Sequence, residues 1–268
     1  MSKIIALDAG HGLSTAGKRC LKSLDKNETR EWFLNDRIMD LVESTLKSTY
    51  DCTVIRTDDT TGKKDISLLA RVKTANQAKA DVFISMHHNA GINGGTGGGT
   101  VVYYSSSKAE RVGQAQRLYD RIVNLTGLKG NRSQKVIKKG FYVIAKTTMP
   151  AFLVENGFMD SSTDVPIILS ESHAKRTAEG VVAFLVDMLG LKKKAAQSTP
   201  TITSNVYYPA YKGKKDTLSN ALKSLGIDNS YSFRKKIAKA NGISGYSGTA
   251  TQNTRMYNLL VAGILKRV

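Results

Sequence analysis

Two histidines and a glutamate are the residues of this sequence whose types and spacing best fit metal chemistry. His11 follows the apolar run in "IIALDAGHG", and His87 follows the one in "DVFISMHHN". Both runs read as short buried strands, so the two imidazoles are expected to meet at one edge of a sheet. Glu31, in "NETREWFLN", adds a carboxylate. Two neutral imidazoles and one carboxylate leave the fourth position of a tetrahedral Zn²⁺ open for water, as in hydrolytic zinc sites.

Glu28 competes with Glu31 for this role, because both lie near the start of one predicted helix. Glu31 falls on a helix stripe whose other members are Leu34, Ile38, Leu41 and Thr45. Glu28 lies about 100° from the centre of that stripe at 3.6 residues per turn. A carboxylate on a core-facing stripe is costly unless it is paired or metal-bound, whereas Glu28 fits a solvated acid in the first helical turn. The helix phase therefore favours Glu31.

Three other polar residues have alternative interpretations. His88 competes with His87, because neighbours on an extended segment point to opposite sides and only one is expected to face a metal. His173 begins a predicted helix, so a capping or surface role is expected. Glu155 ends the apolar run in "MPAFLVENGFMD" and should emerge at the same sheet edge. It fits either a structural acceptor or an acid–base group that takes a proton from an activated water and passes it to a leaving group.

Length and composition indicate an ordinary globular protein. The chain has 268 residues, 41% of them hydrophobic and 23% charged, enough to bury a sizeable core and a smaller second one. Cys20 and Cys52 have no metal-ligand spacing and are expected to be free thiols. The apolar run 4–7 is too short for a signal peptide, and no stretch approaches the ~20 apolar residues of a membrane span. We therefore expect synthesis in the cytoplasm without a signal peptide, and no membrane partner.

The positive charge is concentrated at the end of the chain. Residues 192–268 carry 14 Lys and Arg against Asp216 and Asp228, which is a net +12 of the total +18. Such an excess attracts polyanions, whether nucleic acid, anionic lipid or the acidic polymers of a cell wall. Tyrosines in the same region could stack on sugars or on bases, so charge alone leaves DNA binding open. They are Tyr207, Tyr208, Tyr211, Tyr231 and Tyr246.

Apolar runs alternate with helical patterns through the first 191 residues, which predicts an α/β fold: a largely parallel sheet of about six strands with helices on both faces. Strands are predicted at 3–7, 53–56, 82–86, 100–104, 141–144 and 152–154. Helices are predicted at about 29–48, 68–78, 108–124 and 171–189.

Two domains joined by a linker are expected. Residues 1–191 form the catalytic domain, and 192–205, "KKKAAQSTPTITSN", shift to small and polar residues typical of a linker. Residues 206–268 then form a small, basic, helix-rich module, with helix patterns at 217–225, 232–240 and 249–262 and a strand around 206–211.

Four motifs together resemble one enzyme family. "DAGHG", Glu31 with Leu34 three residues later, "SLLARVKTANQAKADVFISMHHN" and "MPAFLVENGF" resemble, in order and spacing, the zinc-dependent N-acetylmuramoyl-L-alanine amidases called amidase 3. The resemblance covers about residues 1–190. The chain departs from the family pattern at Leu13, where a second glycine is usual, and over residues 14–27, at the rim of the expected site.

The resemblance implies roles for five residues. Carried over by motif, His11, Glu31 and His87 correspond to the zinc ligands, which favours His87 over His88. Glu155 corresponds to the catalytic glutamate, and Asn89 matches a supporting asparagine. The implied reaction is hydrolysis of the amide between N-acetylmuramic acid and the L-alanine of the peptide stem in peptidoglycan, with the zinc lowering the pKa of its water.

The resemblance also bears on origin and partners. An amidase without a signal peptide, followed by a linker and a basic module, resembles a phage endolysin of a Gram-positive host that acts on the wall after release. Residues 206–268 would then bind peptidoglycan and anionic wall polymers rather than nucleic acid. The alternatives are a host autolysin or spore-stage lytic amidase, or a zinc hydrolase that cuts within the peptide stem. The absence of "HExxH" argues against one common class of zinc peptidases.

Overall fold

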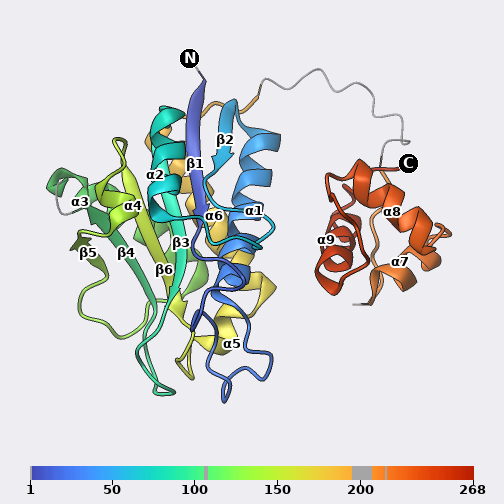
Figure 1. Ribbon diagram of the computed structural model, residues 1–268, viewed down its shortest axis with the longest axis horizontal. Helices are drawn as coiled ribbons and strands as arrows, with labels where there is room; N and C mark the ends of the chain where they lie inside the picture. The colour runs from blue at the N-terminus through green and yellow to red at the C-terminus, as the bar shows by residue number, and fades with distance from the viewer. Residues whose placement is uncertain (1, 106–107, 195–206, 215) are drawn as a thin grey trace. The chain divides into compact units, whose positions relative to one another are not determined.

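In the computed structural model, which describes residues 2–105, 108–194, 207–214 and 216–268, a six-stranded sheet forms the centre of the first part of the chain (Figure 1). The strand order is β2-β1-β3-β6-β4-β5, and only the β4–β6 pair is antiparallel. The strands are β1 (Lys3–Ala9), β2 (Cys52–Arg56), β3 (Val82–Asn89), β4 (Thr100–Ser105), β5 (Val136–Lys139) and β6 (Ala151–Phe158). The predicted fold class is confirmed.

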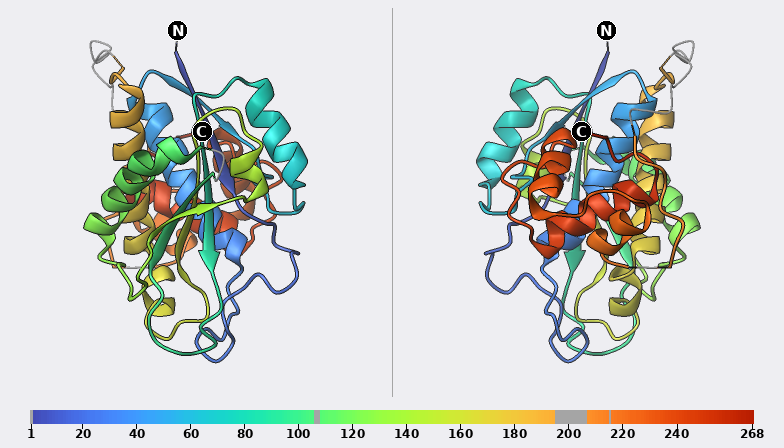
Figure 2. Two further views of the ribbon diagram at one scale, coloured as in Figure 1. Left: turned by 90° about the vertical axis from the view of Figure 1, so that its left-hand side faces the viewer. Right: turned by 90° about the vertical axis from the view of Figure 1, so that its right-hand side faces the viewer.

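Helices cover both faces of the sheet (Figure 2). The first face packs against α1 (Glu31–Thr49), α3 (Val112–Thr126) and α6 (Glu171–Leu189). The second face packs against α2 (Leu68–Gln77) and α4 (Tyr142–Ala145). Because β3 and β6 are central and covered on both sides, they are buried almost throughout. The short elements η1 (Ala109–Arg111) and α5 (Val165–Ile168) complete this part.

The chain divides into two compact units, Met1–Ala195 and Ala196–Val268. The second unit holds α7 (Leu218–Ser224), α8 (Tyr231–Ala240) and α9 (Ala250–Val261), each begun by a Thr or Ser whose side chain accepts from the first turn. These helices enclose a core of their own around Leu222, Ile237 and Leu260. Most of the predicted linker, 195–205, lies outside the described residues.

Two sequence predictions about secondary structure need correction. In the apolar run 141–144, predicted as a strand, Phe141 is the N-cap of α4 and residues 142–144 lie within that helix; the strand beside β4 is β5 at Val136–Lys139. Edge strand β5 ends in two exposed lysines, so its sequence lacks the continuous apolar run of the central strands. At 207–211, Tyr207 contributes an isolated antiparallel bridge to Lys266 in place of the predicted strand, and residue 206 lies outside the described part.

His173 is buried, so the expected surface or capping role was wrong. Ser170 caps α6 by accepting from the His173 backbone N–H, which leaves the imidazole free to turn inwards. There the His173 Nε2 atom lies 2.9 Å from Asn156 Nδ2. Burial, aided by the charges of Arg37 and Arg176, lowers the pKa of His173 to about 4.

No helix in the described residues is long and apolar enough to cross a membrane.

The buried His173 predicts a loss of stability in acid. Its pKa is lower in the folded than in the unfolded chain, so the stabilisation is complete above pH 6.5 and is lost as the pH falls towards 4. The free energy of unfolding of both proteins is compared at about pH 7 and about pH 4.5. The unmodified chain should lose roughly 2–3 kcal/mol more over this interval than His173→Gln, which lacks the buried imidazole. Urea unfolding with a chelator present, followed through the single, buried Trp32, measures this difference.

Lys175→Gln, an exposed change on the same helix, is the control and should behave like the unmodified chain. An equal loss in His173→Gln and the unmodified chain would contradict the prediction.

Candidate metal centre and active site

Three adjacent parallel strands bring the predicted site residues to one edge of the sheet. His11 lies two residues beyond the end of β1, while His87 and Glu155 lie near the carboxyl ends of β3 and β6. In the sheet register His87 pairs with Glu155. Open α/β sheets place their sites at this carboxyl edge, so the topology alone brings these three side chains towards each other.

His11, Glu31 and His87 form a compact group, named here the His–Glu–His cluster. Glu31 Oε1 lies 3.4 Å from His11 Nε2 and 3.1 Å from His87 Nδ1. One nitrogen or oxygen atom from each residue lies within 4.8 Å of the others. The two imidazoles meet edge to face with ring centroids 4.9 Å apart. The structure therefore brings together the three residues that the sequence predicts as ligands.

The Glu31 carboxylate fits a metal ligand by its burial and by its unused oxygen. Its side chain is 1% exposed, and its Oε2 atom has no hydrogen-bond partner in the described part of the chain. Burial by itself raises the pKa of Glu31, but the contacts with His11 and His87 outweigh it and hold the pKa well below its usual range. A buried, ionised carboxylate between two imidazoles is a donor set that suits Zn²⁺.

Lys18 and the start of α1 position the carboxylate further. Glu31 is the first residue of α1, where the helix dipole favours an anion, and its backbone N–H donates to the Lys18 carbonyl at 3.0 Å. The Lys18 ammonium lies 3.7 Å from Glu31 Oε2. Glu28, the competing acid, lies outside the helix and pairs with Arg19 at 3.2 Å.

His11 has a backbone conformation that few side chains adopt. Its φ is +67°, in the left-handed region, which costs a non-glycine residue about 1–3 kcal/mol and persists only where the surroundings enforce it. Arg71 provides that enforcement. Its guanidinium donates to the His11 carbonyl at 3.0 Å and to the Ala9 carbonyl at 2.8 Å. Two carbonyls on either side of Gly10 are thus fixed by one buried cation.

Asp8 anchors Arg71 in turn. Asp8 Oδ1 accepts from Arg71 at 2.7 Å and from Thr57 at 2.7 Å, while Oδ2 accepts from Ser85 at 2.6 Å. Burial raises the pKa of Asp8, but the Arg71 charge and these hydrogen bonds outweigh it, so the pKa is lowered overall. The sequence reasoning missed this pair. The available signal was an arginine between apolar residues on the buried face of α2.

Gly10 leaves the space that the His87 ring occupies in the cluster. A Cβ atom at position 10 would lie 2.0 Å from His87 Cε1, so the imidazole packs against backbone that only glycine leaves open. His88 is buried on the opposite side of β3, where its Nδ1 lies 2.7 Å from Asn35 Oδ1. The Asn35 amide donates to the Gly10 carbonyl at 3.2 Å. His88 therefore supports the loop from beneath, through Asn35.

Glu155 has the electrostatic character of a proton-transfer group. Burial raises the pKa of Glu155 to about 7; the nearby Glu31 charge also raises it, and His87 opposes the rise. Its Oε2 atom has no hydrogen-bond partner among the described residues. A carboxyl group that titrates near neutrality can both accept and donate a proton under physiological conditions.

Asn89 and Tyr103 lie beside Glu155. Asn89 ends β3, and its backbone carbonyl accepts from Met159 at 2.8 Å, which fixes the strand end. Burial raises the pKa of the Tyr103 phenol; the Glu155 charge adds to the rise, and a hydrogen bond with Asn89 opposes it. The sequence reasoning did not identify Tyr103, because a tyrosine in an apolar strand carries no distinguishing pattern.

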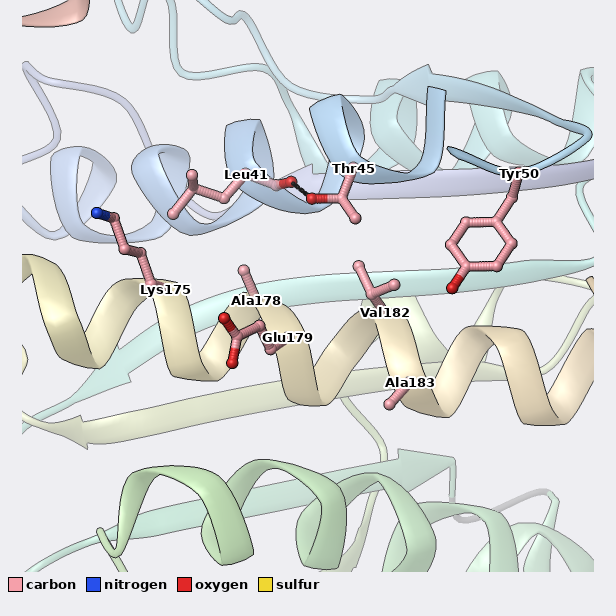
Figure 3. A pocket seen from close by; sticks show the side chains of 8 residues that line it. All are labelled: Leu41, Thr45, Tyr50, Lys175, Ala178, Glu179, Val182 and Ala183. Carbon is pink, nitrogen blue, oxygen red and sulfur yellow. Dashed lines mark hydrogen bonds between the residues drawn. The ribbon is translucent and has the colours of Figure 1, made fainter. Parts of the chain in front are cut away.

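A depression between α1 and α6 is separate from this chemistry (Figure 3). It is lined by Leu41, Thr45, Tyr50, Lys175, Ala178, Glu179, Val182 and Ala183. None of these residues belongs to the predicted site. Thr45, predicted on the core-facing stripe of α1, is exposed, and its hydroxyl bonds the Leu41 carbonyl at 2.8 Å. The buried face of α1 instead continues through Val42 and Leu46.

The fold and the donor set define a class of protein: an α/β enzyme with a candidate mononuclear, hydrolytic metal site at the carboxyl edge of its sheet. Comparison with known proteins is more specific. Residues 5–187 match the family model Amidase_3, N-acetylmuramoyl-L-alanine amidase, and the chain belongs to this family. It is thus a hydrolase of the class that acts on amide bonds in peptidoglycan. The second unit lies outside the matched range.

Curated relatives and solved structures are of the same kind. The chain is 34% identical over 203 residues to the endolysin of Bacillus phage SPP1, covering 75% of this chain and 71% of the relative. It is 32% identical over 192 residues to the amidase CwlM of Bacillus licheniformis, covering 72% and 71%. The catalytic domain of the amidase CwlV from Bacillus (Paenibacillus) polymyxa var. colistinus superimposes with a TM-score of 0.62 at 28% identity, covering 71% of this chain and 99% of that domain.

Because the Asp8–Arg71 pair positions His11, we expect a substitution of Arg71, which is not itself a candidate ligand, to lower metal affinity. Arg71→Met leaves Asp8 buried without its cation, which should cost about 3–5 kcal/mol of stability. It also releases the His11 carbonyl, so metal affinity should fall. The double variant Asp8→Asn/Arg71→Met should regain stability without regaining affinity. Chemical unfolding and chelator competition measure the two quantities.

Lys73→Met, an exposed change on the same helix, is the matched control and should alter neither quantity. A folded Arg71→Met or double variant that binds metal as tightly as the unmodified chain would refute the positioning role of Arg71.

Proposed function

We propose that the chain is a zinc-dependent N-acetylmuramoyl-L-alanine amidase, in which His11, Glu31 and His87 hold the metal and Glu155 moves the proton. The observation that carries this proposal is the His–Glu–His cluster, in which Glu31 Oε2 has no hydrogen-bond partner among the described residues, next to a carboxyl group in register with His87. When bound, zinc supplies Lewis-acid chemistry, polarising a carbonyl and lowering the pKa of water.

The protein side chains divide the remaining tasks. Glu155 accepts a proton from the attacking water and delivers it to the stem nitrogen as the bond between the lactyl carbonyl and L-alanine breaks. Its pKa of about 7 suits both transfers. Asn89 and Tyr103 occupy positions from which they can orient Glu155 or the substrate. Asp8, Arg71 and Gly10 keep the two imidazoles in place before substrate arrives.

We further propose that residues 206–268 bind the bacterial wall, as a module joined by the linker 192–205 to a catalytic domain of residues 1–191. The net charge of +12 beyond residue 191 and the separate core of the second unit support this role, because a basic module attracts the anionic polymers of a wall. The similarity to a phage endolysin supports a lytic role after release. A host autolysin or spore-stage amidase would use the same chemistry.

The division of roles between Glu155 and Glu31 can be separated experimentally. Glu155→Gln should keep about one zinc per chain and lose roughly 100-fold or more in wall hydrolysis, because the metal ligands remain while the proton carrier is removed. Glu31→Gln should lose the zinc itself. Metal analysis and a turbidity assay on purified walls provide the two readouts. Glu28→Gln, a change in the competing acid, should keep both zinc and activity.

Wall hydrolysis by Glu155→Gln at the rate of the unmodified chain would refute the catalytic assignment. Loss of zinc in Glu28→Gln but not in Glu31→Gln would refute the ligand assignment.

The bond that is cut distinguishes this function from peptidase activity. Mass spectrometry of digested peptidoglycan should show free stem peptides that begin with L-alanine. Shortened stems that remain attached to muramic acid would indicate a zinc peptidase instead. A preparation with the metal removed by a chelator should release neither product until zinc is restored.

A further inference from the structure

Tyr231 is the most exposed aromatic side chain among the described residues of the second unit, yet it is held in place. The side chain is 49% exposed at the first position of α8. Its hydroxyl donates to the Tyr246 carbonyl at 3.3 Å, and the two rings lie 5.6 Å apart, tilted by 33°. An aromatic ring with a fixed orientation and an open face is a platform for stacking, because little side-chain freedom is lost when a ligand binds.

The turn beneath this ring is held by partly buried hydrogen bonds. Tyr246 is 5% exposed, and its hydroxyl donates to Asn253 Oδ1 at 2.6 Å. Arg234 Nη1 donates to the same oxygen at 3.2 Å, and the Asn253 amide donates to the Gly248 carbonyl at 2.9 Å. Gly248 has a φ of +76°, and a Cβ atom there would approach Tyr231 Cε2 to 3.2 Å. The Tyr231 ring thus packs closely against this turn, because Gly248 has no side chain to separate them.

Positive charge lies on the same side of the helix. Lys235 follows Tyr231 by four residues, which places the two on one face of α8, and both are exposed. An apolar ring face beside an ammonium group matches a sugar ring that carries a carboxylate. The pyranose C–H groups would contact the aromatic face, and the acid would pair with the lysine.

Hydrolysis by the first unit produces such a sugar. Water adds across the bond, the amide C–N bond breaks, the stem leaves as an amine, and the lactyl group on muramic acid becomes a free carboxylate. We propose that Tyr231 and Lys235 form a subsite for the sugar acids of glycan strands from which the stem peptides have been removed. The subsite rests on the proposed wall-binding role of the second unit and would keep the enzyme on strands that it has already processed.

Nucleic acid fits this surface less well. Proteins that bind single strands without sequence preference stack successive bases on several exposed rings. Here the other tyrosines and Phe233 are buried or partly buried in the described part of the unit. The single open ring suits one sugar better than a run of bases.

Binding to peptide-free glycan strands tests the subsite with the full chain. These strands contain no amide bond to a stem, so binding is measured without hydrolysis. By calorimetry, Tyr231→Ala and Tyr231→Leu should each weaken binding at least about tenfold, whereas Tyr231→Phe, which keeps the ring, should stay within about threefold. Lys235→Ala should weaken binding at low salt and have little effect at high salt.

Val261→Ala, a change at an exposed apolar residue of the same unit, is the matched control and should bind like the unmodified chain. Thermal unfolding identifies any variant that fails to fold, and Tyr231→Leu keeps enough apolar volume to serve if Tyr231→Ala does not. Glycan binding by Tyr231→Ala or Tyr231→Leu equal to that of the unmodified chain would overturn the proposal. So would variants that lose binding to single-stranded DNA but keep binding to glycan.

Hydrolysis of soluble muropeptides by the same variants should be unchanged. This readout separates the two proposals. If even the unmodified chain fails to cut muropeptides, the amidase proposal fails while the binding result still stands.

Discussion

The buried ion pair between Asp8 and Arg71 is the interaction on which the candidate site depends most. Replacing one partner of such a pair leaves an uncompensated charge in the core, while the pair itself adds little net stability. Its value here is geometric, because the guanidinium fixes the carbonyls of Ala9 and His11 and so enforces a left-handed backbone. The strain at His11 is maintained by the core beneath it. The backbone of His11, a proposed metal ligand, is therefore held in place by the protein itself.

Much of the fold follows from elementary patterns in the sequence. Central strands β3 and β6 each begin with a short apolar run, and α6 is bounded by a serine cap and a glycine end, so these elements were predictable. The edge strand β5 was not predictable from its sequence. An edge strand needs little apolar surface, and the two lysines that end β5 interrupt the alternation of apolar and polar residues that marks a strand. The apolar run at 141–144 is too short to distinguish a strand from a helical turn, and tertiary packing against β4 and β6 decides in favour of α4.

The candidate site was predictable where burial or topology determines it. Helix phase selected Glu31, which is fully buried at the start of α1. Residue patterns could not separate His87 from His88, since strand alternation states only that the two face opposite ways. The structure distinguishes them by their contacts: His87 packs against Gly10, where a Cβ atom would clash, whereas His88 bonds Asn35. The prediction for His173 was wrong because Ser170, and not His173, caps the helix. The His173 imidazole is instead buried beside Asn156.

We propose that one zinc ion binds among His11, Glu31 and His87. Anomalous diffraction at the zinc absorption edge, from crystals grown with zinc, tests it most directly. We expect one strong peak about 2.0–2.1 Å from a nitrogen of each histidine and about 2.0–2.2 Å from a Glu31 oxygen. A peak at His88 or His173 with none at the cluster, or no peak at the cluster at saturating zinc, would contradict it.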